Sequence, residues 1–181
     1  MIKSKFSMAF AIFLLLAACA EKDTTFLITE TSVGPLQTNS ASEALAQLFV
    51  GDSIVRDTSS SKLIASKKIQ IFETGGNKLL SLTPKQDSSL TIGNIQIHDE
   101  RYQTASGIGL GSTFGDIQST LGIKKIVTTF NSIVVFPKNG PLYFTIDKDQ
   151  LPANLRYSNS RIEAVQVPET AKIKFLMVGW D

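Results

Sequence analysis

Three glycines at alternate positions open the stretch GIGLGSTFGDIQSTLG, residues 107–122, directly before a short helical pattern. A glycine-rich turn ahead of a helix can cradle phosphate, because the free N–H groups and the helix dipole attract anions. Nucleotide-binding loops have one of two patterns: Gly-x-Gly-x-x-Gly with an acidic residue about twenty positions later, or Gly-Lys-Ser/Thr. This stretch has neither pattern. Thr113 and Asp116 have the spacing of a helix cap, which would occupy the same N–H groups. We therefore interpret the stretch as a strand-to-helix turn.

The chain has a single histidine, His98, through which any Ser-His-Asp arrangement must pass. Ile95 and Ile97 alternate with polar residues before it, so on a strand His98 shares the opposite face with Gln96. That pattern predicts the solvated face of an edge or surface strand. The sequence also lacks the Gly-x-Ser-x-Gly elbow that presents a nucleophilic serine. We expect His98 to be a surface residue without a catalytic role.

The acidic residues that could serve as ligands or acids are the pairs Asp147/Asp149 and Asp99/Glu100. A calcium loop needs more oxygen ligands in a glycine-hinged run than either pair supplies. The sequence therefore predicts no metal site, no cofactor and no enzymatic activity. A pair of carboxylates for glycoside cleavage stays open as an alternative, because the distance between such groups is set by the fold and not by sequence spacing.

The N-terminus carries Lys3 and Lys5, followed by a run at residues 6–18 that is apolar apart from Ser7. This order is typical of a secretory signal peptide. The run ends in Leu-Ala-Ala-Cys, which resembles the bacterial lipobox, and that resemblance implies that Cys19 is acylated, with chains such as palmitate, and becomes the first residue after cleavage. We expect residues 1–18 to be a lipoprotein signal peptide and residues 19–25 to be a lipidated tether. An ordinary signal peptide with a chance cysteine is the alternative.

Composition excludes several classes of protein. The chain has 18 Lys and Arg against 16 Asp and Glu, and loss of Lys3 and Lys5 with the signal peptide would make these counts equal. A neutral chain has no basic field to recruit nucleic acid. Cys19 is the only cysteine, so we expect no disulfide within the chain. Ala20 follows Cys19, and by the sorting rule of Gram-negative lipoproteins this favours the outer membrane. A surface-export signal in the charged residues 21–23 is the alternative.

The body of the chain shows one order of elements twice. Residues 28–51 and 104–122 each contain an extended segment with glycine, a capping residue, a short apolar-periodic stretch and a final glycine. Ser40 and Glu43 have the spacing of a capping box in the first copy. Residues 69–82 and 133–146 then match as strand-rich runs that are joined by a glycine turn, which predicts two hairpins.

Further along, residues 92–100 match residues 162–169 as alternating strands, and a closing strand at 172–180 has no partner. We predict one α+β domain at residues 26–181, a largely antiparallel sheet with two short helices. An internal duplication of a strand-helix-hairpin-strand unit, with pseudo-repeats at about 26–100 and 101–170, explains the order. The alternative is chance recurrence of a helix followed by a hairpin. Residues 56–68 and 149–160 are expected to be polar connections.

Two segments carry a family resemblance. SVGPL at residues 32–36 after an Ile-Thr-Glu strand, and GIGLGSTFGDI at residues 107–117 after a strand that ends in IHD, resemble a group of uncharacterised Gram-negative lipoproteins. That group comprises a domain of unknown function and envelope-stress (RpoE-regulated) lipoproteins. The resemblance covers residues 28–122 and implies no catalytic residue. Some members carry cysteines after the second helix that this chain lacks, so no disulfide is implied here.

These observations predict an outer-membrane-anchored lipoprotein that acts as a non-enzymatic interaction or accessory module of the cell envelope. Its expected partners are the membrane, through Cys19, and an envelope protein, with no nucleic acid. Exposed strand edges and the hairpin tips near residues 75–76 and 139–140 are the expected contacts. A small-ligand or lipid-binding module is one alternative, indicated by a deep apolar cavity under residues 114–121. A carboxylate-based glycan hydrolase is the other, indicated by two carboxylates in one cleft.

Overall fold

The computed structural model describes residues 23–56, 68–85, 90–158 and 160–180. The expected signal peptide, Cys19 and most of the tether lie outside these residues, as does most of the expected connection at residues 56–68. The described part is an α+β fold built on two sheets, which confirms the predicted fold class. The larger sheet has eight strands and the smaller sheet has four.

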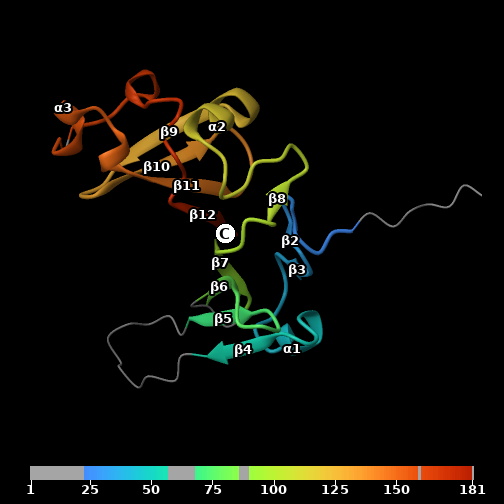
Figure 1. The fold of residues 1–181 in the computed structure, drawn as a ribbon. Helices are drawn as coiled ribbons and strands as arrows, with labels where there is room; N and C mark the ends of the chain where they lie inside the picture. The colour runs from blue at the N-terminus through green and yellow to red at the C-terminus, as the bar shows by residue number, and fades with distance from the viewer. Residues whose placement is uncertain (1–22, 57–67, 86–89, 159, 181) are drawn as a thin grey trace, which may run out of the picture.

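The eight-stranded sheet is antiparallel throughout and has the order β4-β5-β6-β7-β12-β11-β10-β9. Its strands in chain order are β4 (Ser53–Arg56), β5 (Ile69–Phe72), β6 (Lys78–Pro84), β7 (Ile92–Ile97), β9 (Ile123–Thr128), β10 (Ser132–Pro137), β11 (Leu142–Asp147) and β12 (Phe175–Gly179). Figure 1 shows the halves β4–β7 and β9–β12 meeting at β7 and β12. Strand order is therefore symmetrical about this junction, as a duplicated unit requires.

The two predicted hairpins are confirmed as equivalent parts of the halves. β5 and β6 pair in the first half, and β10 and β11 pair in the second. The predicted match of residues 92–100 with 162–169 is wrong, because residues 164–166 form the 3-10 helix η2 (Ala164–Gln166) and no strand. The counterpart of β7 is β12, so the strand predicted to be without a partner completes the second half.

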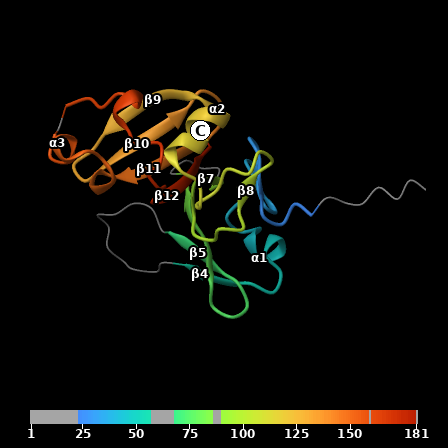
Figure 2. The same ribbon diagram turned by 45° about the horizontal axis from the view of Figure 1, so that its top comes forward.

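The four-stranded sheet joins the start of the described chain to the connection between the halves. Its strands are β1 (Leu27–Ile28), β2 (Ser32–Val33), β3 (Leu36–Gln37) and β8 (Gln103–Thr104), in the order β3-β2-β1-β8. β1 and β8 pair in parallel, and the other pairs are antiparallel. Figures 1 and 2 show this sheet beside the junction of the halves, on the side away from α3.

Helices are short, as predicted, but the described residues contain three α-helices where two were predicted: α1 (Leu45–Leu48), α2 (Phe114–Leu121) and α3 (Ala153–Arg156), together with the 3-10 helices η1 (Lys148–Gln150) and η2. The additional helix, α3, lies within residues 149–160, which were expected to be a connection. The capping box predicted at Ser40 and Glu43 is wrong: α1 begins after Ala44 without a side-chain cap, and the Ser40 hydroxyl accepts from the Gln37 amide instead. α2 does begin with the predicted capping box of Thr113 and Asp116. Figures 1 and 2 show α2 alongside β9 and β10.

One contiguous hydrophobic core lies against one face of the large sheet. A row of core residues crosses seven strands in register and consists of the buried Ile71, Leu80, Ile97, Leu176, Phe144 and Val135 and the partly buried Ile126. α1 contributes Leu45 to this core and α2 contributes Phe114 and Ile117. Because side chains alternate along a strand, the neighbours of this row point to the opposite face.

Candidate functional site

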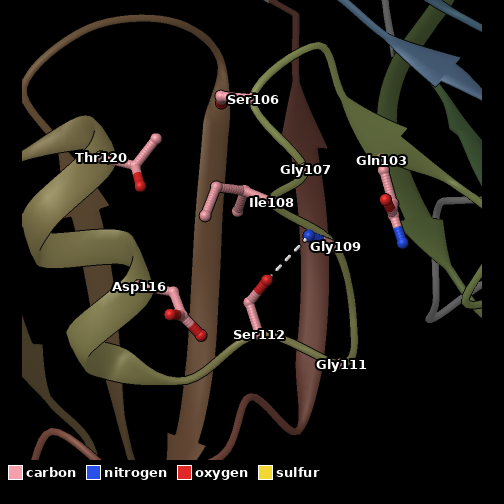
Figure 3. Close-up of a pocket in the computed structure, with 9 residues that line it drawn as sticks. All are labelled: Gln103, Ser106, Gly107, Ile108, Gly109, Gly111, Ser112, Asp116 and Thr120. Carbon is pink, nitrogen blue, oxygen red and sulfur yellow. Dashed lines mark hydrogen bonds between the residues drawn. The ribbon is translucent and has the colours of Figure 1, made fainter.

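The glycine-rich turn before α2 lies beside a hollow of about 430 Å³, which Figure 3 shows. The first N–H groups of the helix, however, already have protein acceptors. Phe114 donates to the Ala171 carbonyl at 2.8 Å and Gly115 donates to the Glu169 carbonyl at 2.9 Å. The Asp116 amide donates to the Thr113 hydroxyl, and the Asp116 carboxylate lines the hollow. An anion would meet a negative charge and occupied donors, which argues against a phosphate site.

The three glycines of this turn differ in whether the local backbone requires glycine. Gly107 has φ +82°, a left-handed conformation that favours glycine. A Cβ atom on Gly109 would lie 2.8 Å from the Tyr102 carbonyl oxygen, because Gly109 and Gln103 pair in an isolated β-bridge. Gly111 has open space around it. The turn therefore needs glycine for its path at the first two positions, as expected for a strand-to-helix turn.

The space under α2 is filled by side chains. Phe114 and Ile117 point into the core and are 0 % exposed. The hollow beside the helix is lined mainly by glycine and polar residues of the turn, with Ile108 as an apolar member. The deep apolar cavity that would have indicated a ligand under this helix is not found among the described residues, where this space belongs to the packed core.

His98 differs in part from its predicted position. It follows β7, which is an internal strand between β6 and β12, and its side chain is half-buried. The His98 Nε2 atom lies 2.9 Å from the Ser81 hydroxyl of the neighbouring strand. Burial lowers the pKa of His98 below its ordinary 6.5, and the charges of Lys78 and Lys68 lower that pKa further. The predicted face is confirmed, because His98 contacts Ser81 on the side of the sheet away from Ile95 and Ile97. The predicted exposure is wrong, because β7 has a neighbouring strand on each side and the His98 side chain is half-buried.

The Ser81–His98 contact is a pair that sequence reasoning missed. Ser81 lies on β6, and the β6–β7 register brings it next to His98. The spacing of the two residues in the sequence therefore does not predict the contact. A catalytic serine also needs a third group that orients the histidine and donors for the oxyanion. In the described chain, His98 has no side-chain hydrogen bond besides the one with Ser81. The pair is therefore best explained as a structural hydrogen bond within the sheet.

Two of the four acidic residues considered as ligands are engaged in ion pairs. Asp147 accepts from Lys174 at 2.8 Å, and Asp99 accepts from Arg101 at 2.8 Å. Those contacts with Arg101 hold the pKa of Asp99 below its usual range. Asp149 and Asp147 line one hollow, but the Asp147 carboxylate is paired with Lys174, which argues against a pair of free carboxylates for glycan hydrolysis there. Within the described ranges, no group of three or more His, Cys, Asp or Glu side chains could hold a metal ion.

The hairpin tips predicted as contacts are exposed turns. Gly75 and Gly76 join β5 to β6, and Gly140 joins β10 to β11; all three have positive φ. They project from the ends of equivalent hairpins. A more extensive candidate surface lies between them, on the face of the large sheet opposite the core.

We call this surface the open face. One of its rows runs from β5 to β10 and consists of Gln70, Ser81, Gln96, Met177, Tyr143 and Phe136. A second row on the later strands consists of Phe175, Thr145, Val134 and Val127. The first half of the sheet therefore presents mainly polar side chains, with Val55 as an exposed exception, and the second half presents mainly apolar ones. None of the apolar side chains of the open face belongs to the described core.

The apolar half of the open face is held in a defined geometry. Phe136 and Tyr143 stack with ring centroids 5.6 Å apart. The Asn94 side-chain amide donates to the Tyr143 hydroxyl, and the Lys125 ammonium lies 4.6 Å from the Phe136 ring centroid. Phe175 is 38 % exposed. Stacked, hydrogen-bonded rings lose little conformational freedom on contact, which suits them as anchors of an interface.

Three lysines lie at or beside the open face. Lys78 and Lys68 lie near enough to His98 to lower its pKa, and Lys125 covers Phe136. None of these three lysines has a carboxylate partner among the described residues. A surface with an apolar strip and unpaired cations is complementary to a surface with apolar side chains and carboxylates.

Comparisons with known proteins show the fold and nothing further. No family model matches the chain, and no curated protein matches it. The chain is similar to the crystal structure of the uncharacterized protein yfeY from Escherichia coli, with a TM-score of 0.53 and 15 % identity, over 84 % of this chain and 98 % of that chain. Similarity at this identity establishes a shared fold alone. No helix among the described residues is long and apolar enough to cross a membrane.

Proposed function

We propose that this chain is a non-enzymatic interaction or accessory module of the bacterial cell envelope. In this proposal the lipid on Cys19 anchors it to the outer membrane, and the open face contacts a protein partner. The observation that carries the proposal is the set of apolar and aromatic side chains on β9–β12 that the fold leaves outside its core. Large exposed apolar patches on a protein surface mark interaction sites.

The dimensions of the open face suit such a contact. Eight strands at about 4.8 Å spacing and six residues at about 3.4 Å rise give a face of roughly 700 Å². Stable protein–protein interfaces bury about 800 Å² on each partner. The aromatic residues Phe136, Tyr143 and Phe175 lie in its apolar half, and aromatic side chains contribute most to interface energies. The open face alone therefore supplies most of one standard interface.

A protein partner is favoured over a membrane surface. Side chains that bind a bilayer enter it by about 5–10 Å. Phe136 and Tyr143 instead lie flat against each other at an interplanar angle of 18° and are half-buried within the sheet. Such half-buried rings offer a flat surface on which another protein can pack.

The test compares two substitutions that place the same charge at exposed sites. The tagged, lipidated chain is crosslinked in its own envelope and purified as wild type, Phe175→Asp and Val165→Asp. Phe175 belongs to the open face, whereas Val165 is 90 % exposed on η2. We expect the same partner with wild type and Val165→Asp, and its loss with Phe175→Asp. Equal recovery with both variants would place the contact elsewhere, and no partner with any form would refute the interaction role.

The anchor is tested separately. Cys19→Ser should abolish metabolic fatty-acid labelling and move the chain out of the membrane fraction, because this substitution removes the acylated sulfur. Labelling retained at the wild-type level would show that Cys19 carries no lipid. This result leaves the test of the open face unaffected, because that test measures a partner and not the anchor.

A further inference from the structure

A second candidate site lies at one end of the large sheet, in a hollow of about 570 Å³. We call it the Phe130–Tyr157 hollow, after the two aromatic residues in its lining. Phe130 lies in the turn between β9 and β10, and Tyr157 follows α3. Their exposed fractions are 83 % and 93 %. The volume is in the usual range of small-molecule sites, about 300–1,000 Å³.

The lining contains a buried cation with little compensation. Lys148 is 3 % exposed, and its ammonium donates to the Ser158 carbonyl at 2.7 Å. An ammonium has three donors, and the described residues supply this single acceptor and no carboxylate within ion-pair distance. Burying a cation without an opposite charge is unfavourable, so an anion in the hollow would be stabilised there.

Arg156 adds a second set of donors. Its Nε atom donates to the Leu151 carbonyl at 2.8 Å, which fixes the side chain, and the terminal nitrogens have no partner among the described residues. A guanidinium presents its terminal N–H groups as a planar fork that matches a carboxylate. Lys148 and Arg156 line the same hollow, so both cations attract an anion that binds there.

The charge count selects a singly charged anion. Lys174 and Asp147 line the hollow as a neutral ion pair at 2.8 Å. Lys148 and Arg156 then face the single carboxylate of Asp149, which leaves one net positive charge. A carboxylate neutralises that charge. A phosphate group carries a charge of about −1.5 to −2 near neutral pH, which exceeds the single positive charge of the lining.

The remaining lining describes the body of the ligand. Phe130 and Tyr157 offer apolar ring faces, whereas Asn131 and Asp149 offer hydrogen-bonding groups at the same hollow. A fatty acid would leave these polar groups unpaired, and an open, charged lining suits it poorly. A sugar ring has C–H faces that pack on aromatic rings and hydroxyl groups that bond to amides and carboxylates. The geometry points to a binding site for a sugar acid, a sugar ring that carries one carboxylate.

The test uses probes that differ by one feature each. Binding of glucuronate, glucose, phenylacetate and acetate to the purified full chain is measured by NMR titration at pH 7. We expect glucuronate to bind with a dissociation constant on the order of 1 mM, as its size implies. Glucose lacks the carboxylate and should bind at least tenfold more weakly. Phenylacetate or acetate binding as well as glucuronate would overturn the assignment, since either would show recognition of an anion without a sugar.

Variants connect the binding to these residues. Arg156→Gln should remove the preference for glucuronate over glucose, because its fork provides the carboxylate contact. Tyr157→Ala should weaken both sugars, because the ring face is shared. Val165→Ala, another exposed site near the C-terminus, is the control and should leave binding unchanged. Unchanged glucuronate affinity in Arg156→Gln and Tyr157→Ala, or no glucuronate binding at 20-fold above the expected constant, would refute the site. Neither result bears on the partner of the open face.

Discussion

Gly109→Ala and Gly111→Ala test whether the glycine turn before α2 serves the fold. The two residues lie in one turn, and neither has a positive φ. The two substitutions therefore differ only in the room that the structure leaves for the added Cβ atom. A Cβ atom at position 109 would lie 2.8 Å from the Tyr102 carbonyl oxygen and 2.9 Å from the Gln103 Cγ atom. At position 111 it would meet nothing within 4 Å.

The expected magnitudes follow from that difference. Overpacking at a tight site costs about 1–3 kcal/mol. Glycine-to-alanine at an open site stabilises by about 0.4–1 kcal/mol, through the unfolded state. We therefore expect Gly109→Ala to lower the free energy of unfolding by about 1–2 kcal/mol and Gly111→Ala to leave it equal or slightly raised. In urea this separates the two midpoints by roughly 1 M.

The assay is urea unfolding followed by the fluorescence of Trp180, the single tryptophan, which is buried. Equal effects of the two substitutions, or a larger loss from Gly111→Ala, would refute the packing argument. Inorganic phosphate at 10 mM should leave both midpoints unchanged, because the N–H groups that begin α2 already have acceptors. A phosphate-dependent rise of the wild-type midpoint would restore the phosphate site.

Four further substitutions test other parts of the fold. Burial lowers the pKa of His98 below 6.5, so on acidification the unfolded chain binds a proton at a higher pH than the folded chain does. The free energy of unfolding of the wild type should therefore fall as the pH drops below about 6.5. Urea midpoints measured from pH 7.5 to 5.5 should show this fall in the wild type and a smaller fall in His98→Gln. Phe114→Ala should cost about 3–5 kcal/mol because the ring is fully buried, whereas Phe130→Ala should stay within about 0.5 kcal/mol. Thr113→Ala should cost about 1 kcal/mol by removing the α2 cap, and no change in its thermal midpoint would contradict that role.

Local patterns predicted the parts of this fold that depend on neighbouring residues. The two hairpins follow from alternating apolar residues and glycine turns, and the cap of α2 follows from Thr113 and Asp116. The edge strands β4 and β9 were missed. An edge strand has one neighbour and buries little: Lys124 and Lys125 are exposed on β9, and Ser53, Val55 and Arg56 are exposed on β4. Their sequences therefore lack a clear apolar face.

Pairing between the halves could not be predicted from local patterns. β7 and β12 are far apart in sequence, and their register is set by packing of Ile95 and Ile97 against Val178 and Leu176. The same lack of long-range information misplaced the repeat boundary. Residues 162–166 alternate like a strand, yet Glu163 and Gln166 form a capping box for η2.

The residues of the two candidate surfaces also could not be predicted from the sequence. Phe136, Tyr143 and Met177 alternate with core residues, and the sequence does not say which face of the sheet is covered. Lys148 is a lysine in a loop by sequence, and only the fold shows that it is buried. The sequence lists the aromatic residues, but the strand order is needed to assign each of them to the core or to the open face.

The most direct test of the central claim is photo-crosslinking from single positions in the lipidated chain within its own envelope. A photoreactive phenylalanine analogue is placed at Val127 or Phe175 on the open face, and at Val50 or Val165 as exposed controls elsewhere. We expect one shared protein adduct from both open-face positions and none from the controls. An adduct of equal yield from Val50 or Val165, or none from Val127 and Phe175, would contradict it.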